Sequence, residues 1–108
     1  MTRSSVRGSR TGRPVMVLLD ALGRRWSLRV LWELRGGPLP FRALRERCDD
    51  VSPSVLNARV AELRELGLVE LTEEGYALSG EGRSLGELLV PLDAWARRWG
   101  ARRAKSKP

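Results

Sequence analysis

Serine and asparagine side chains, which can both donate and accept hydrogen bonds, occur early in the segment SPSVLNARVAELREL, residues 52–66. Ser52 is a favourable helix N-cap and Pro53 a favourable first helical residue, so this segment is predicted to form a helix. Leu56, Val60 and Leu63 follow at i, i+4 and i+7. This spacing places the three side chains on one side of the helix and predicts that they are buried.

The opposite side of this predicted helix carries small and polar residues. At about 100° per residue, the residues opposite the apolar stripe are Ser54, Asn57, Ala58 and Ala61. No acidic residue of the helix precedes Glu62. An amide can form paired hydrogen bonds with adenine, so Asn57 is the predicted base reader; the alternative is a tolerated surface amide. Ser52 and Ser54 are predicted to donate to phosphate or bases at the helix N-terminus. For Ser52, a capping role alone is the alternative.

Arginine side chains near this helix are candidate phosphate contacts. Arg42, Arg45 and Arg47 lie in the preceding segment FRALRERC, residues 41–48, which is predicted to form a two-turn helix. Solvated surface arginines are the alternative reading. Arg59 lies close to the apolar stripe of the next helix, so a phosphate contact and an internal ion pair are both open for it.

The residue types present argue against catalysis. The 108 residues include no histidine and one cysteine, Cys48, which removes the commonest general base, the Ser-His and Cys-His pairs, and most zinc sites. Cys48 falls on the apolar face of residues 41–48, so we expect it to pack as a small hydrophobe; a reactive thiol is the alternative. We expect no enzyme activity, no metal and no cofactor.

Positive charge is concentrated at the two ends of the chain. Residues 1–13 carry four arginines, residues 97–108 carry four arginines and two lysines, and neither end carries an acid. The formal net charge is +7, so the middle of the chain is slightly acidic. Cationic ends favour a polyanion, with nucleic acid first and a membrane surface second; an aid to solubility is the alternative. A presequence also fits the N-terminal composition, but we expect residues 1–13 to be a disordered basic arm.

The order of predicted elements indicates a winged helix-turn-helix. Helices are expected over 14–22, 26–35, 41–48 and 52–66, followed by a short hairpin of 68–71 and 76–78 and a last helix that Ser79 caps. The second helix is expected to bury Leu28, Leu31, Trp32 and Leu34. We expect a mainly α fold with a small β-hairpin (α+β), comprising one domain over 14–100 and a basic tail over 101–108. No apolar run reaches the roughly 18 residues that cross a bilayer.

Apolar residues in the first and last helices predict a homodimer. The stripe of the last helix, with a kink expected at Pro91, is longer than a 108-residue monomer needs. Leaving both helices exposed would create a larger apolar patch than monomers usually carry. The predicted interface comprises Val15, Leu18, Leu19, Leu88, Leu92, Trp95 and Trp99. Trp26, Trp32, Trp95 and Trp99 are expected in the core and interface; lining a pocket for an unknown small-molecule effector is the alternative.

Pro14 is followed in order by LDALGRRWSLRVLWEL (19–34), FRAL (41–44), VSPSVLNARVAELRELGLVE (51–70), YALSGEGRSL (76–85) and Trp95. Over about residues 14–99, this pattern resembles the HxlR-type family of bacterial winged-helix transcriptional regulators. The resemblance implies a cytoplasmic protein that forms a two-fold dimer through its first and last helices. It also implies binding to double-stranded operator DNA, with repression or activation of neighbouring genes.

Three positions depart from the family pattern. Many members carry a cysteine before the proline that matches Pro14, and some sense oxidants with it; Arg13 stands here, which excludes that chemistry at this position. The wing, residues 72–75, is short and acidic, which argues against a minor-groove contact. Ser54 stands where lysine is frequent in the family, so we expect one phosphate or base contact fewer. The alternative function is a protein-interaction or effector-binding winged helix with only non-specific affinity for DNA.

Overall fold

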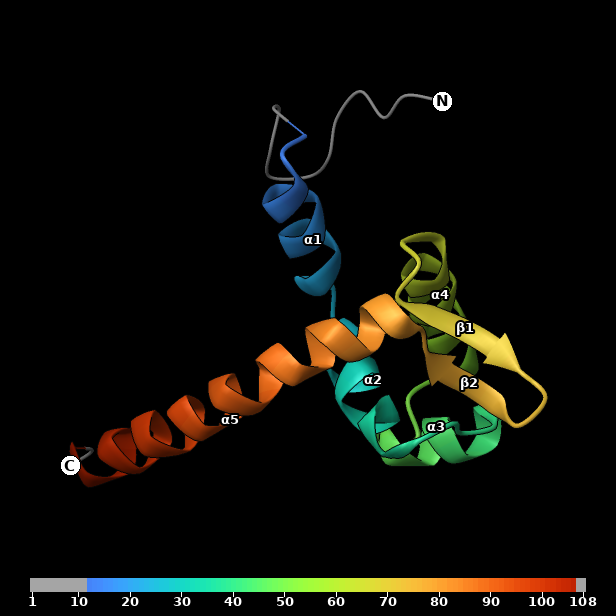
Figure 1. The fold of residues 1–108 in the computed structure, drawn as a ribbon. Coiled ribbons are helices and arrows are strands. Elements are labelled where there is room, and N and C mark those ends of the chain that lie inside the picture. Colours follow the sequence, from blue (N-terminus) through green and yellow to red (C-terminus); the bar gives the residue numbers. More distant parts are fainter. Residues whose placement is uncertain (1–11, 107–108) are drawn as a thin grey trace.

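The computed structural model describes residues 12–106, most of which are helical. The elements are α1 (Pro14–Leu22), α2 (Ser27–Glu33), the 3-10 turn η1 (Leu34–Gly36), α3 (Phe41–Arg47), α4 (Pro53–Glu65), β1 (Val69–Thr72), β2 (Gly75–Leu78) and α5 (Gly80–Ser106). Figure 1 shows α2, α3, α4 and the hairpin gathered together, while α1 and α5 extend away from them. Residues 1–11, most of the predicted N-terminal arm, lie outside the described part.

Helix α2 is the centre of the packing, since it contacts α1, α3, α4 and α5. Its buried residues are Ser27, Val30 and Leu31, and Leu34 of η1 continues the same face. The prediction that Leu28 is buried is wrong, because 40% of that residue is exposed. Helical spacing explains the error: residues 27, 30, 31 and 34 form one face, and Leu28 lies on another, toward α5.

Local signals set both ends of α4 as predicted. The Ser52 hydroxyl accepts a hydrogen bond from the Val55 N–H at 3.2 Å, which satisfies one of the unpaired donors at the helix start. Gly67 follows the helix with φ of +78°, a left-handed conformation that glycine adopts without a steric penalty. The predicted stripe of Leu56, Val60 and Leu63 is buried in the core.

The hairpin makes one contact that the sequence interpretation missed. Strands β1 and β2 are antiparallel, with Val69 opposite Leu78. Leu39, in the connection before α3, also pairs with Tyr76 through two backbone hydrogen bonds of 2.9 Å. Gly75 lies against this connection with φ of +124°, and a Cβ there would overlap the Leu39 backbone. The hairpin is therefore tied close to its turn to the segment that leads into α3.

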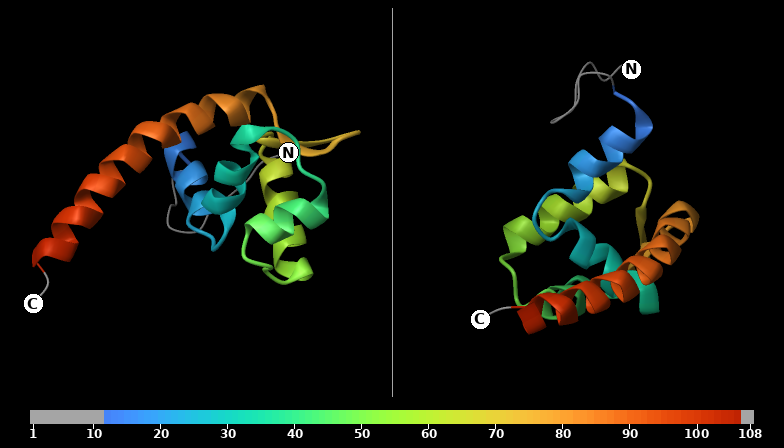
Figure 2. Two further views of the ribbon diagram at one scale, coloured as in Figure 1. Left: turned by 90° about the horizontal axis from the view of Figure 1, so that it is seen from below. Right: turned by 90° about the vertical axis from the view of Figure 1, so that its left-hand side faces the viewer.

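Helix α5 is longer than expected and projects beyond the other elements (Figures 1 and 2). The Ser79 hydroxyl caps it by accepting from the Gly82 N–H at 3.0 Å, and the helix continues through Pro91. Residues 101–106, part of the predicted basic tail, are helical and continue α5. Alanine, arginine and lysine are strong helix formers and continue the helix there. Within residues 12–106, no helix combines the length and apolar character needed to cross a membrane.

Candidate nucleic-acid interface

Helices α3 and α4 form the helix-turn-helix, and the turn between them has an unusual backbone. Asp49 and Asp50 both have positive φ, +58° and +57°. The turn is closed by the Asp50 N–H, which donates to the Arg45 carbonyl at 2.9 Å, and by the Val51 N–H, which donates to the Cys48 carbonyl at 3.1 Å. This turn fixes where Ser52 lies and hence where α4 begins.

The first two turns of α4 present an outward surface of small and polar side chains. Ser52, Ser54 and Asn57 are exposed, and Ala58 is partly buried. The Ser54 and Ser52 hydroxyl oxygens lie 3.5 Å apart. No acidic side chain occurs on α4 before Glu62. A surface with exposed amide and hydroxyl groups and no negative charge can approach the base edges of a major groove.

The candidate arginines differ in what they contact. Arg42 is exposed and makes no hydrogen bond or ion pair within the described residues. Arg45 is engaged in the turn: its Nε donates to the Val51 carbonyl at 2.6 Å. Arg47 lies 3.6 Å from the carboxylate of Glu33 and is half-exposed.

Of the two contacts predicted for Arg59, the structure contains the internal ion pair. Only 17% of its side chain is exposed, and its guanidinium lies 3.3 Å from the Glu62 carboxylate. The same carboxylate lies 3.5 Å from Arg24, in the connection after α1. Arg59 therefore helps to join α4 to the α1–α2 connection, and a phosphate contact by this residue stays a prediction.

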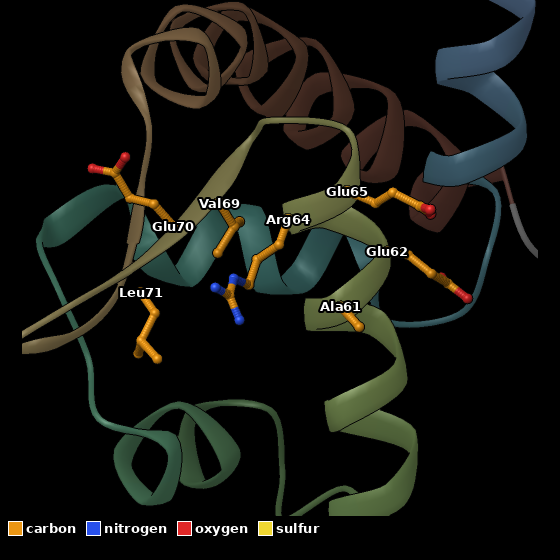
Figure 3. Close-up of a pocket in the computed structure, with 7 residues that line it drawn as sticks. All are labelled: Ala61, Glu62, Arg64, Glu65, Val69, Glu70 and Leu71. Carbon is orange, nitrogen blue, oxygen red and sulfur yellow. The ribbon is translucent and has the colours of Figure 1, made fainter. Parts of the chain in front are cut away.

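The C-terminal half of α4 carries acidic side chains, unlike its first two turns. It borders a shallow cleft of about 610 Å³ against β1, lined by Ala61, Glu62, Arg64, Glu65, Val69, Glu70 and Leu71. In Figure 3, Arg64 extends toward β1, whereas Glu62 and Glu65 point to the other side of the helix. Glu73 and Glu74 at the exposed wing tip add further negative charge. Carboxylates thus occur at the C-terminal end of α4 and at the wing tip, whereas none precedes Glu62 on α4, which makes the N-terminal half of α4 the better candidate to approach phosphates.

A second surface is apolar and involves α1 and α5. Helix α1 has no buried residue, and Leu18 packs partly against the core. Large exposed side chains of the two helices include the predicted interface residues Val15, Leu19, Leu88, Leu92, Trp95 and Trp99, and also Val90 of α5. Trp95 and Trp99 stack with ring centroids 5.7 Å apart, and the Arg103 guanidinium lies over the Trp99 ring at 4.9 Å. All seven predicted interface residues therefore lie on these two helices, and only Leu18 is partly covered.

A groove of about 370 Å³ runs between α2 and α5 beside this apolar surface. Its lining residues are Leu28, Arg29, Trp32, Leu89, Leu92, Asp93 and Ala96. Its volume lies at the lower end of the range typical of small-molecule sites. Of the four tryptophans, Trp32 lines the groove, and Trp26 packs partly against the core.

Cys48 is fully buried in the core, as expected for a small hydrophobic residue. Burial raises the pKa of its thiol, and the nearby positive charge of Arg29 opposes that shift. A protonated, inaccessible thiol is a poor nucleophile. Among the described residues, no group of three or more histidine, cysteine or carboxylate side chains could hold a metal ion.

The sequence interpretation did not single out Arg29. Its Nη2 donates to the Arg47 carbonyl at 2.6 Å, and its Nη1 lies 3.4 Å from the Asp49 carboxylate. These partners are 18 and 20 residues away along the chain. No local spacing in the sequence signals such contacts, because folding alone brings α2 against the end of α3.

Comparison with known proteins agrees with this geometry. A family model described as HxlR-like helix-turn-helix matches residues 21–104. An uncharacterized HTH-type transcriptional regulator of Bacillus subtilis, YvaP, is 26% identical over 88 residues, which cover 75% of this chain and 82% of the relative. Both proteins are thus matched over most of their length.

Solved structures show the same fold. Quinone-bound YodB from B. subtilis has a TM-score of 0.72 and 27% identity, covering 78% of this chain and 96% of that chain. A possible HxlR family transcriptional factor from Thermoplasma volcanium also has a TM-score of 0.72, with 25% identity, covering 82% of this chain and 85% of that chain. The predicted winged-helix architecture is therefore confirmed.

Proposed function

The chain belongs to the HxlR-like helix-turn-helix family, and we propose that this DNA-binding transcriptional regulator reads operator DNA as a homodimer, with α4 in the major groove. The observation that carries the proposal is the outward face of the first two turns of α4. That face exposes Ser54 and Asn57, and no acidic residue of α4 precedes Glu62. The acidic half of the helix lies toward the wing, so the N-terminal half is the part that enters the groove.

The dimer part of the proposal is supported by the exposed apolar side chains of α1 and α5. A monomer would leave Leu88, Leu92, Trp95 and Trp99 in water together with Val15 and Leu19. Covering them with a second copy removes apolar surface from water at roughly 25 cal/mol per Å². A two-fold dimer would set two α4 helices about 34 Å apart, one turn of B-DNA, so we expect a pseudo-palindromic operator.

Positive charge supplies the part of the affinity that does not depend on sequence. Arg42 on α3 is exposed and free to approach a phosphate, and the end of α5 carries several more cations. Phosphate contacts set affinity and orientation, while base contacts set sequence preference. We infer that Asn57 supplies preference and that these cations supply affinity.

Asn57→Ala tests the assignment of the reader. The wild-type protein first selects its preferred duplex from a random pool, and affinities for that duplex and its single-base variants are then compared. Loss of a bidentate amide contact should cost about 1–3 kcal/mol at one base pair in each half-site. Glu65→Ala, an exposed change in the acidic half of the same helix, is the control and should leave base preference unchanged. If Asn57→Ala leaves both the affinity and the base preference unchanged, Asn57 does not read a base.

The groove between α2 and α5 supports a second role, the binding of a small-molecule effector. It joins apolar side chains such as Leu28 and Trp32 with the charged groups Arg29 and Asp93. YodB, a structural relative, was solved bound to a quinone. Titration with simple quinones, followed by tryptophan fluorescence, tests this role directly because Trp32 lines the groove.

Non-specific DNA binding alone is the competing function. Affinity for random duplex DNA would then equal affinity for any selected sequence at every salt concentration. A purely electrostatic complex weakens steeply as salt rises, whereas base contacts retain a preference. If all duplexes bind with equal affinity at every salt concentration, operator reading is refuted and non-specific DNA binding is favoured.

A further inference from the structure

The turn that leads into α4 is held by two arginine side chains from outside the turn. The Nε of Arg45 donates to the Val51 carbonyl at 2.6 Å, and its Nη2 donates to the Asp50 carbonyl at 3.4 Å. From the other side, the Nη2 of Arg29 on α2 donates to the Arg47 carbonyl at 2.6 Å. Three carbonyl oxygens at the end of α3 and in the turn thus accept from these two guanidinium groups.

The backbone of this turn needs such support. Asp49 and Asp50 are consecutive non-glycine residues in the left-handed region, with φ of +58° and +57°. Such conformations cost free energy for residues that carry a Cβ, although less for aspartate than for most, and two in succession are held by the surrounding contacts. The turn contains no glycine that would relieve this cost.

Arg29 connects the turn to the centre of the fold. Its Nε donates to Glu33 at 2.8 Å on the same helix, and its Nη1 reaches Asp49 at 3.4 Å. Glu33 also lies 3.6 Å from Arg47. Arg29 therefore attaches the turn directly to α2, the helix against which the other helices pack.

We propose that Arg29 and Arg45 are positioning residues that hold the α3–α4 turn and so set how α4 is presented to DNA, with Arg45 not acting as a phosphate contact. This inference rests on the proposed function, since it assigns the two side chains a role in DNA reading. Arg45 affects DNA reading only by holding the turn in position. Its guanidinium donates to carbonyl oxygens and is therefore not free to contact a phosphate. Arg42, one turn earlier on the same helix, is the matched residue with an unengaged side chain.

Lysine and glutamine substitutions separate the two roles. A phosphate contact needs a positive charge, which lysine keeps, whereas the Arg45 contacts need a planar fork with separate N–H donors, which lysine lacks. Arg45→Lys and Arg45→Gln should both reduce the ratio of selected-duplex to random-duplex affinity by about tenfold or more, with the salt slope retained. Arg42→Gln removes one charge from each copy in the dimer, so it should lower the salt slope by about 1.8 and leave that ratio unchanged. Arg42→Lys keeps the charge and should retain most of the salt slope.

Amide hydrogen exchange on the free protein gives a readout that needs no DNA. The N–H groups of Asp50 and Val51 are hydrogen-bonded within the turn. Arg45→Lys and Arg29→Lys should raise exchange at these two amides by about tenfold, while amides in the middle of α5 and the thermal unfolding midpoint stay near wild type. Arg42→Lys should change neither amide.

Each result supports or overturns the inference. Wild-type behaviour of Arg45→Lys in both assays, with a lower salt slope for Arg45→Gln, would make Arg45 a phosphate contact and overturn it. Unchanged exchange at Asp50 and Val51 in the Arg29 variant would remove Arg29 from the role. Should the wild-type protein prefer no sequence, operator reading fails on its own, and the exchange measurement still decides whether the two arginines hold the turn.

Discussion

Leu92→Arg should convert the proposed dimer into a monomer while leaving the fold intact. Leu92 is 53% exposed and borders the groove beside α2, so it is not part of the buried core. A leucine side chain contributes roughly 1.5–3 kcal/mol when it is moved fully out of water. About half of that, roughly 0.8–1.6 kcal/mol, remains available for burial by a partner. A two-fold interface uses the residue twice, so the loss is about 1.6–3 kcal/mol.

That loss corresponds to a dissociation constant about 15- to 150-fold weaker, before the cost of burying an arginine charge is added. Sedimentation over a concentration series measures the dissociation constant of both proteins. Val90→Arg is the matched control, because Val90 is 46% exposed on the same helix but borders a different hollow, beside Arg35 and Arg83. This variant should dimerise as wild type does.

Two results would refute the reasoning. A monomeric mass for the wild-type protein at micromolar concentration would show that the exposed side chains of α1 and α5 have some other role. An unchanged dissociation constant for Leu92→Arg, with Val90→Arg weakened, would place the interface on the other side of α5. Thermal unfolding of both variants confirms that the fold has survived.

Three further outcomes are expected. Changing Glu73 and Glu74 to Gln should leave DNA affinity equal or higher at one fixed salt concentration, since carboxylates at the wing tip repel phosphate; loss of specific binding would show that the wing reads DNA. Deleting residues 101–108 should weaken binding to all duplexes by a similar factor and flatten the salt dependence, and a changed sequence preference would contradict this. Because burial raises the pKa of Cys48, the folded protein releases the thiol proton at higher pH than the unfolded chain does. This contribution to stability is present below about pH 8.5, the value of a free thiol, and falls as pH rises further, so the unfolding free-energy difference between wild type and Cys48→Ala should narrow there.

The sequence alone was sufficient for the elements whose signals are local. Ser52, Pro53 and Gly67 mark the ends of α4, and the spacing of its apolar residues identifies the buried side. The same local logic predicted the hairpin. Helix propensity beyond Gly100 was present in the sequence too, but the string of positive charges was interpreted as a tail. The order of these elements was then sufficient to predict the winged-helix fold, because few arrangements pack such helices and strands around one core.

Only the tertiary structure decided what the long charged side chains contact. Arg42, Arg45 and Arg59 look alike in the sequence, yet the first is exposed, the second holds a turn and the third pairs with Glu62. An arginine side chain can reach partners in many directions, so its contacts depend on which carbonyl or carboxylate packing brings near. The pairing of Leu39 with Tyr76 has the same cause. Local sequence specifies conformation over a few residues, whereas these contacts exist only once distant segments have met.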